Sequence, residues 1–254
     1  MPKDKNRTVV VTGAAQGIGY HIAKAFVEHG DFVALLDVQE EKVSEAAESL
    51  GKKAKGYKVD VTNEENVQFV IQSILEEKGS IHVLVNNAGM QHIDPIEKFP
   101  LEKWNQLLSV MLTGTFLMTK HILPIMKNQK RGTIINISSA HGKVASKYKA
   151  AYVSAKHGVE GFTKTIAIEA ASYGITANTI MPGPVKTKLI ENQVAKIAQQ
   201  EDLTAEEVEH KFFFDKQLIK RFIDTEEIGG TALFLASKYA RNITGESISV
   251  SGGI

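Results

Sequence analysis

The chain contains no cysteine, and this absence removes several possible functions. Without thiols there are neither disulfides nor thiolate metal sites, and we expect no bound metal. A chain without cysteine suits a reducing compartment. Neither sign of charge dominates, because 30 Lys and Arg residues stand against 29 Asp and Glu residues, a formal net charge of +1. This balance gives no reason to expect nucleic acid or an anionic membrane as a partner.

We also expect no membrane-spanning segment, because we interpret every apolar run of the sequence as too short to span a bilayer. The first residues, MPKDKNRTVVVTG, are polar and lead directly into a strand pattern, unlike a signal peptide. Repeats, linkers and low-complexity segments are absent. We therefore expect one cytoplasmic domain over residues 1–254, a length that is typical of an α/β domain with a wide sheet.

Short β-branched apolar runs alternate with longer amphipathic segments. Strands are predicted at 8–13, 32–38, 55–62, 81–89, 132–139, 175–183 and 245–253. Helices are predicted at 17–30, 39–51, 63–79, 101–129, 150–174 and 225–237, with a stop at Gly30 and a cap at Asn63. The alternation predicts an α/β fold with a Rossmann-type, doubly wound parallel sheet and helices on both faces. The charged segment 188–220 interrupts it, and we interpret this segment as a helical flap over the substrate site.

A glycine-rich turn follows the first predicted strand. The segment TGAAQGIG places Gly13, Gly17 and Gly19 between that strand and the first helix. Glycines let the backbone turn tightly and approach a pyrophosphate, which then lies on the helix N-terminus. The spacing differs from the commoner G-x-G-x-x-G and, taken alone, is also compatible with a plain tight loop. The position between strand and helix favours dinucleotide binding.

Asp37 ends the second predicted strand and bears on the choice of cofactor. A carboxylate there can accept hydrogen bonds from the adenosine ribose hydroxyls and would repel a 2′-phosphate. Because no basic residue follows at once, we predict NAD rather than NADP; the alternative is a turn aspartate at a strand end. The other cofactor contacts predicted in the glycine-rich turn and at strand ends are Gln16, Ile18, Asp60, Val61, Asn87, Ala88 and Gly89.

Taken together, the motifs resemble the short-chain dehydrogenase/reductase family over essentially the whole chain. The resemblance is carried by TGAAQGIG, Asp60, NNAG (86–89), Ser139, the Tyr152-x-x-x-Lys156 pair and PGPVKT (182–187). It implies that Tyr152 is the general acid/base, that Lys156 lowers its pKa and holds the nicotinamide ribose, and that Ser139 holds the substrate oxygen. It also implies that the protein is a homotetramer. A further implication is that the PGPVKT segment closes against the nicotinamide through Pro182, Gly183, Val185 and Thr187.

The segment KAAYVSAKHG explains how the tyrosine could work as a base. In a helix, Lys149, Tyr152 and Lys156 would share one face. A free tyrosine has a pKa of about 10, and lowering it by about 3 units takes roughly 4 kcal/mol of differential stabilisation. A lysine charge together with the positive nicotinamide ring favours the phenolate. The phenolate can then take the hydroxyl proton while hydride leaves the same carbon.

A closer resemblance concerns the substrate. NNAGMQH, SSAHG, KAAYVSAKHG and VKTKLIENQV are similar to segments of bacterial D-3-hydroxybutyrate dehydrogenases. The resemblance implies reversible oxidation of D-3-hydroxybutyrate to acetoacetate, with the substrate carboxylate held by Gln91, His141, Lys149 and Gln193. A cation with neutral donors suits a small 3-hydroxy acid. Each of these residues taken singly is also compatible with a structural or surface role.

Two positions depart from the family pattern. Met111, in SVMLTG, stands where the family usually has an asparagine that stabilises a kink and binds a water on the proton path. A thioether is a weak acceptor and cannot donate, so proton relay should weaken by about 10²-fold unless another group substitutes. Ser251, in SVSGGI, stands where relatives commonly have Asp, so the C-terminal subunit contacts of the family do not transfer directly.

Other functions stay open at this point. One is NAD-dependent oxidation of another small alcohol or sugar acid. Another is a catalytically impaired NAD-binding protein, which Met111 favours and which the intact Ser139, Tyr152 and Lys156 oppose. A 3-ketoacyl-carrier reductase is less favoured, because such enzymes normally use NADPH and a basic docking patch.

Overall fold

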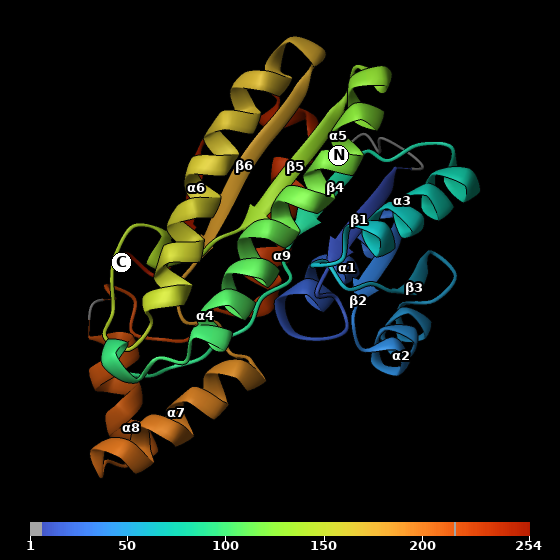
Figure 1. The fold of residues 1–254 in the computed structure, drawn as a ribbon. Helices are drawn as coiled ribbons and strands as arrows, with labels where there is room; N and C mark the ends of the chain where they lie inside the picture. The colour runs from blue at the N-terminus through green and yellow to red at the C-terminus, as the bar shows by residue number, and fades with distance from the viewer. Residues whose placement is uncertain (1–6, 216) are drawn as a thin grey trace.

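The computed structural model, which describes residues 7–215 and 217–254, contains a seven-stranded sheet in the order β3-β2-β1-β4-β5-β6-β7 (Figure 1). All neighbouring strands are parallel. The strands are β1 Thr8–Thr12, β2 Phe32–Asp37, β3 Ala54–Lys58, β4 Val83–Asn86, β5 Gly132–Ile137, β6 Ile175–Pro182 and β7 Ser247–Val250. Winding reverses between β1 and β4, and ligands of such sheets bind at this switch point, outside the carboxyl ends of the strands.

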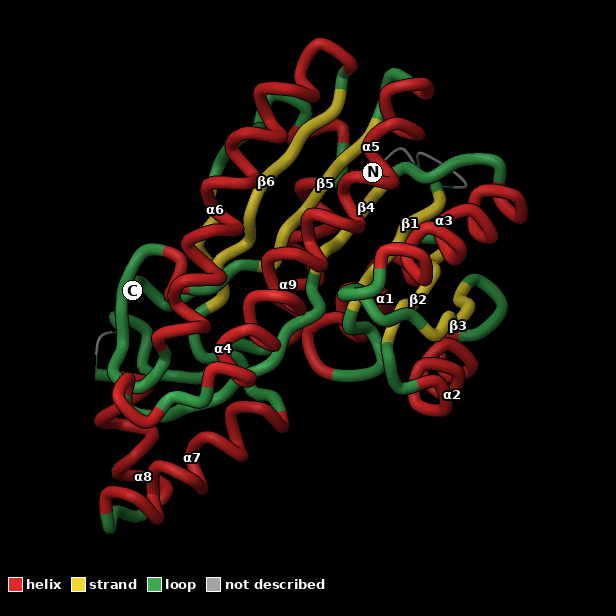
Figure 2. Tube along the Cα trace, viewed as in Figure 1, coloured by secondary structure: helices red, strands yellow, loops and turns green. Residues whose placement is uncertain are grey.

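Helices cover both faces of the sheet (Figure 2). They are α1 Gly17–His29, α2 Glu40–Leu50, α3 Glu64–Lys78, α4 Leu101–Leu108, α5 Gly114–Gln129, α6 Ala150–Ala170, α7 Lys188–Glu201, α8 Ala205–Val208 and α9 Thr225–Leu235. Helices α1 and α9 pack together on one face, whereas α3, α5 and α6 cover the other. The predicted Rossmann-type, doubly wound α/β fold is confirmed.

The strands carry apolar side chains on both faces of the sheet, which explains why helices pack on both faces. Side chains alternate along β1, so that Val9 and Val11 join the core on the α1 and α9 face while Val10 joins the core on the other face. All three are fully buried. Strands buried on both faces read as unbroken apolar runs, as TVVVT does.

Two predicted helix ends have the expected local chemistry. Gly30 follows α1 in the left-handed region with φ of 105°, where a residue without Cβ carries no steric penalty. Asn63 precedes α3, and its side chain accepts a hydrogen bond from the Asn66 backbone N–H at 2.9 Å. That bond satisfies one of the free N–H groups at the helix start.

The helix predicted over 101–129 is interrupted. A π turn, Ser109–Thr113, separates α4 from α5, and the buried Met111 lies within it. The expectation that no apolar run reaches membrane-spanning length needs correction. By length and composition alone, the helical segment Leu101–Gln129 is long and apolar enough to cross a membrane, with a mean hydropathy of 1.3. Core helices have the same character, and 44% of that apolar window is buried within the protein.

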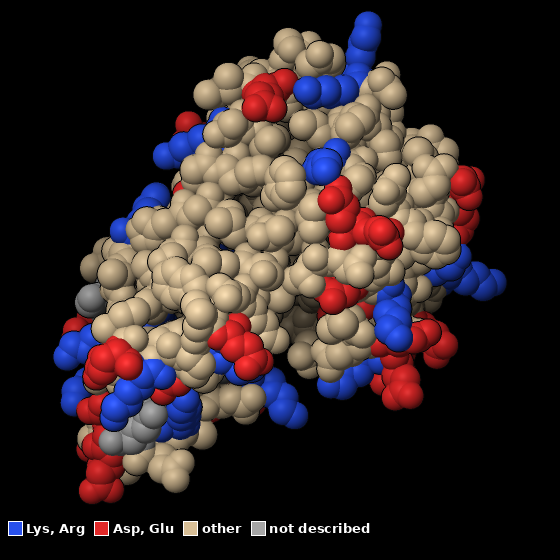
Figure 3. Space-filling model, viewed as in Figure 1, with Lys and Arg blue, Asp and Glu red and all other residues tan. Residues whose placement is uncertain are grey.

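The flap is helical, as predicted, and consists of α7, α8 and a π turn over Glu209–Phe214. It projects from one end of the sheet below α4 (Figure 1). Its own small core contains Val194, Val208, Phe213 and Phe214. Charged side chains gather on this corner, whereas the central surface over α5 and α6 carries few (Figure 3).

The C-terminal residues pair with the segment that leaves the flap. The backbone N–H groups of Leu218 and Ile219 donate to the Gly252 carbonyl at 2.9 Å. The Gln217 side chain donates to the Ser251 carbonyl at 3.1 Å, and the Ser251 hydroxyl lies 2.8 Å from that of Ser249. Ser251 therefore acts here within its own chain.

Candidate active site

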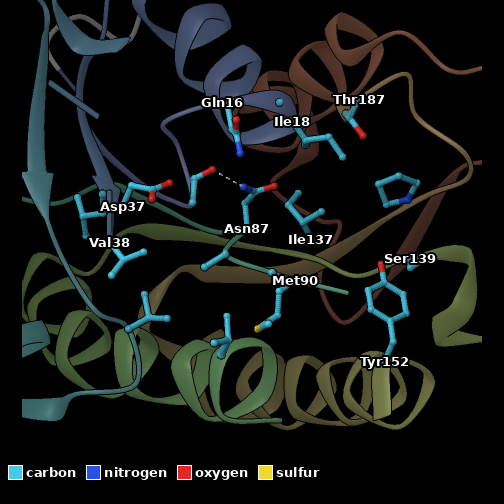
Figure 4. Close-up of a pocket in the computed structure, with 18 of the residues that line it drawn as sticks. Gln16, Ile18, Asp37, Val38, Asn87, Met90, Ile137, Ser139, Tyr152 and Thr187 are labelled. Carbon is cyan, nitrogen blue, oxygen red and sulfur yellow. Dashed lines mark hydrogen bonds between the residues drawn. The ribbon is translucent and has the colours of Figure 1, made fainter. Parts of the chain in front are cut away.

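A cavity of about 730 Å³ opens at the carboxyl ends of the strands (Figure 4). Its lining includes most residues that the sequence assigns to cofactor and catalysis: Gly13, Gln16, Gly17, Ile18, Asp37, Asp60, Val61, Asn87, Ala88, Gly89, Ser139, Tyr152, Lys156, Pro182, Gly183, Val185 and Thr187. Gly19 lies outside this lining, in the first turn of α1. The sheet thus gathers segments far apart in sequence around one space.

The glycine-rich turn leaves no room for side chains at two of its positions. Gly13 has φ of 62°, and a Cβ there would lie 2.8 Å from the Ala88 Cα. A Cβ on Gly19 would lie 2.3 Å from the Gly13 carbonyl oxygen and 2.5 Å from the Asn87 side-chain nitrogen. That nitrogen donates to the Gly13 carbonyl at 3.0 Å and holds the turn against β4. The resulting wall of bare backbone at the start of α1 fits the pyrophosphate of a dinucleotide.

Asp37 is held in position by backbone groups. Its carboxylate accepts from the Ala15 N–H at 3.2 Å and from the Gln39 N–H at 3.1 Å. The side chain lines the cavity at the end of β2 (Figure 4). Asp60 behaves differently, because its carboxylate accepts from both the N–H and the hydroxyl of Thr62 and so shapes its own turn.

Ser139, Tyr152 and Lys156 meet at one side of the cavity. Tyr152 and Lys156 lie one turn apart near the start of α6, and the Lys156 Nζ is 5.6 Å from the centre of the Tyr152 ring. The same Nζ donates to the Ile137 carbonyl at 2.7 Å. Ser139 follows β5, shares a hydrogen bond with Tyr152, and lies beside its hydroxyl end (Figure 4).

Burial dominates the titration of this pair. It raises the pKa of Tyr152, and the hydrogen bond with Ser139 opposes that rise. It lowers the pKa of Lys156 to about 8, while the carboxylate of Glu160, one turn further along α6, raises it. The tyrosine of the protein alone is therefore protonated at neutral pH. The lowering predicted from the sequence includes the positive nicotinamide ring and concerns the loaded site.

The four predicted carboxylate-holding residues lie outside the described lining of this cavity. His141 is nearest to the chemistry, with its Nδ1 at 3.3 Å from the Ser139 Oγ and its ring edge-on to Tyr152 at a centroid distance of 5.9 Å. Gln91 accepts from the His92 N–H at 3.1 Å. The structure therefore brings His141 to the serine–tyrosine pair and does not show all four side chains converging.

Lys149 and Gln193 belong to the flap side. Lys149 is the residue before α6, with φ of −117° and ψ of 31°, and its carbonyl accepts the Val153 N–H at 2.9 Å. Tyr152 and Lys156 lie within the helix, whereas Lys149 caps its start. The Lys149 Nζ lies 5.9 Å from the centre of the Phe213 ring, and burial lowers its pKa to about 8. Gln193 on α7 is buried, and its Oε1 has no hydrogen-bond partner among the described residues.

Several lining residues were not predicted. Val38, Met90, Ile137 and Ser138 line the cavity, and each stands next to a strand end or motif that the sequence analysis had identified. Val38, Ile137 and Ser138 already lie at the ends of the strands predicted over 32–38 and 132–139, and Met90 follows NNAG, so assigning every residue at these ends to the cavity would have found them. Lys188, at the start of α7, also lines the cavity and directly follows Thr187, the last residue of PGPVKT.

Comparison with known proteins agrees with this geometry. A family model described as enoyl-(acyl carrier protein) reductase matches residues 13–254. The chain is 41% identical over 252 residues to the uncharacterized oxidoreductase YxjF of Bacillus subtilis (strain 168), covering 98% of each. It is 38% identical over 250 residues to the D-beta-hydroxybutyrate dehydrogenase of Cupriavidus necator, covering 97% of each.

A solved structure is similar over the same extent. The sorbitol-6-phosphate 2-dehydrogenase SrlD from Erwinia amylovora matches with a TM-score of 0.92 and 33% identity, covering 97% of this chain and 98% of that one. The chain therefore belongs to the short-chain dehydrogenase/reductase family. It is an oxidoreductase of that family, whose members use a nicotinamide cofactor.

Proposed function

We propose that the protein is an NAD-dependent D-3-hydroxybutyrate dehydrogenase that interconverts D-3-hydroxybutyrate and acetoacetate. The observation that carries the proposal is the environment of Lys149. This side chain lies beside the flap against Phe213, and no carboxylate within the described residues pairs with it. Lys149 is partly exposed, and its withdrawal from water disfavours the charged form, so an anionic ligand would restore the stability of that form.

Other polar groups near the flap agree with a small carboxylate ligand. The buried Oε1 of Gln193 lacks a partner among the described residues, and an amide offers a donor as well as an acceptor. We assign Gln91, His141, Lys149 and Gln193 to the carboxylate, by similarity with the named dehydrogenase. For these four to converge, the flap has to close further once substrate binds, which is common in enzymes with lids.

Asp37 supports NAD over NADP. Its carboxylate is anchored by two backbone N–H groups and lines the cavity at the end of β2. A fixed negative charge there accepts hydrogen bonds from ribose hydroxyls and repels a phosphate group. The glycine-rich turn would hold the pyrophosphate, and Pro182, Gly183, Val185 and Thr187 would cover the nicotinamide.

The chemistry follows from three side chains. When bound, the nicotinamide supplies the acceptor for the hydride that leaves the carbinol carbon. Ser139 donates a hydrogen bond to the substrate oxygen and fixes its position. Tyr152 takes the hydroxyl proton at its phenolate oxygen. The Lys156 ammonium, anchored on the Ile137 carbonyl, stabilises that phenolate.

We further propose a cytoplasmic homotetramer. The outer surface of α5 and α6 carries few charges and exposes apolar side chains, with Phe116 44% and Ile168 81% exposed. Apolar patches of this kind mark contact surfaces. Equilibrium sedimentation of the purified protein would measure the oligomeric state directly.

The decisive experiment measures NADH formation from D-3-hydroxybutyrate with NAD, and repeats it with NADP and with a neutral polyol. We expect turnover of the hydroxy acid with NAD and weak activity with NADP. Turnover of the polyol alone would favour a dehydrogenase of another small alcohol or sugar acid. NAD binding without turnover of any substrate would favour a catalytically impaired NAD-binding protein.

A further inference from the structure

Hydrogen-bonded side chains lead from the Tyr152 hydroxyl to the protein surface. Tyr152 is bonded to Ser139, whose Oγ lies 3.3 Å from the His141 Nδ1. The other ring nitrogen of His141, Nε2, lies 2.8 Å from the Ser146 Oγ. Ser146 is exposed to solvent. Every member of this path carries a group that can both give and receive a proton.

The opposite side of Tyr152 is apolar. There the ring packs against a cluster that contains Leu107, Met111, Ala151 and Ala155. None of these side chains can donate a hydrogen bond. Lys156 also lies near the Tyr152 ring, but its Nζ donates to the Ile137 carbonyl. The hydrogen-bonded route from the hydroxyl to an exposed side chain that we follow here runs through Ser139 and His141.

We propose that His141 is a proton relay, which passes the proton of Tyr152 from Ser139 to Ser146 and on to water after each oxidation. This inference rests on the proposed function, because it concerns the proton that the alcohol releases. It gives His141 a task beyond holding the substrate carboxylate.

The hydrogen-bond capacity of Ser139 fits the proposal. A serine hydroxyl has one donor and two acceptor positions. The His141 backbone N–H occupies one acceptor position at 3.2 Å. One acceptor position is left for the tyrosine proton, and one donor is left for the His141 Nδ1. With Nδ1 accepting, Nε2 carries hydrogen and donates to Ser146.

The transfers balance without an added reagent. The Tyr152 proton moves to the Ser139 Oγ as the Ser139 proton moves to Nδ1. The Nε2 proton moves to the Ser146 Oγ, and the Ser146 proton passes to a water molecule. No electrons are exchanged, and one proton leaves for each substrate oxidised. The ring of His141, which is partly exposed, is left with hydrogen on Nδ1 and returns to the Nε2-protonated form by exchange with water, with no net gain or loss of protons, before the next oxidation. In the reductive direction each transfer runs backwards.

The single donor of the Ser139 hydroxyl also determines when the proton can leave the site. When Ser139 holds a substrate oxygen, its donor is engaged and the path through His141 is broken. The relay is complete once the ketone has left. Proton release therefore falls between turnovers, and loss of the relay should slow repeated turnover while leaving the first hydride transfer unchanged.

The variant that separates the two roles is His141→Gln. A glutamine amide can still donate a hydrogen bond to a carboxylate, but it is a poor carrier of protons between its oxygen and nitrogen. His157→Gln is the matched control, because His157 lies on the exposed side of α6 and bonds the Val153 carbonyl. Stopped-flow measurements with D-3-hydroxybutyrate and NAD give the rates of the first and later turnovers.

We expect His141→Gln to lower the steady-state rate by about 10²-fold, the scale of acid–base effects, and to lower it far more than the first-turnover rate. Free imidazole should restore the steady-state rate of His141→Ala in proportion to its concentration. His157→Gln should match the unaltered protein. A slower first turnover with a raised KM and no imidazole rescue would overturn the relay and leave His141 as a carboxylate ligand.

A second measurement is independent of the substrate. The protein loaded with NAD is mixed rapidly into alkaline buffer, and phenolate formation is followed by ultraviolet absorbance, with Tyr152→Phe identifying the signal. We expect the Tyr152 phase to be slower in His141→Gln than in His157→Gln. Equal rates would overturn the relay even if D-3-hydroxybutyrate proves to be the substrate. A slower phase in a protein that ignores D-3-hydroxybutyrate would support the relay and reject only the proposed substrate.

Discussion

The cofactor side and the substrate side of the cavity are built in different ways. The cofactor side consists of strand ends and bare backbone, with Gly13 and Gly19 closed against Asn87 and Ala88. The proposed substrate side consists of longer side chains beside the cavity lining, such as His141, Lys149 and Gln193. The sheet fixes the first side, because strand pairing leaves the strand ends no freedom. The second side depends on where loops and flap settle.

This contrast separates what the protein can vary from what it cannot. A side chain added at Gly13 or Gly19 on the cofactor side meets backbone atoms and has nowhere to relax. On the substrate side, a side chain can change while the fold persists, so specificity can drift there. We therefore expect variants on the two sides to affect different kinetic parameters.

Tyr152→Phe should give the largest effect, because Tyr152 serves both sides. The loss of the acid/base hydroxyl should lower kcat by about 10²- to 10⁴-fold. The ring remains, so the affinity for NAD, measured by calorimetry, should stay near that of the unaltered protein. A comparable loss of NAD affinity would mean that the tyrosine acts mainly in cofactor binding.

Lys149→Met tests the substrate side alone. Removal of a charge-assisted contact worth about 1.5–3 kcal/mol should raise KM for D-3-hydroxybutyrate by roughly 10- to 100-fold. The KM for NAD should not change. Lys147→Met is the matched control, since Lys147 is exposed two residues earlier. An equal rise of KM in both variants would contradict a specific contact.

The same Lys149→Met variant should be more stable than the unaltered protein. Burial lowers the folded-state pKa of Lys149 to about 8, so folding disfavours the charged form. The penalty is full below pH 8 and disappears as pH rises toward the unfolded pKa of about 10.4. We expect a gain of about 1–3 kcal/mol in the free energy of unfolding at pH 7, fading at higher pH. Denaturant titration at several pH values checks this.

Asp37→Ala tests the cofactor side with a smaller effect. Loss of the carboxylate should weaken NAD binding and improve NADP binding, changing the preference by about tenfold, the equivalent of 1.4 kcal/mol. Ratios of kcat/KM for the two cofactors measure it, with Glu41→Ala on the exposed side of α2 as control. An unchanged ratio would remove Asp37 from cofactor selection.

Met111→Asn should have the smallest effect on turnover. Methionine at position 111 was expected to weaken proton relay, but the π turn is present with methionine, and the proposed relay through His141 does not need position 111. An asparagine placed in this apolar cluster would lack partners and should lower stability by about 1–3 kcal/mol. A steep rise in kcat for Met111→Asn would show instead that position 111 limits the proton path.

The sequence could predict the helix ends that local hydrogen bonding fixes and the site residues that the parallel sheet brings together. Gly30 ends α1 and Asn63 caps α3 because each residue satisfies free backbone groups on the spot. The strand-end residues meet because parallel strands place their carboxyl ends at one edge. The start of α6 at Ala150 was also predicted, whereas the place of Lys149 beside Phe213 was not, because that contact joins segments far apart in sequence. Periodicity also passes over the extra residue of a π turn.

The π turn at Ser109–Thr113 has a consequence for how this family member could evolve. One residue in an α-helix corresponds to about 100° of rotation. The π turn takes up one residue more than an α turn, so the loss of that residue would restore a continuous α-helix and keep Met118, Ile122 and Met126 of α5 against the sheet. A deletion inside α5 would instead rotate the side chains beyond it by that angle and take them off the sheet. Changes of length should therefore be tolerated within Ser109–Thr113 and purged from α5.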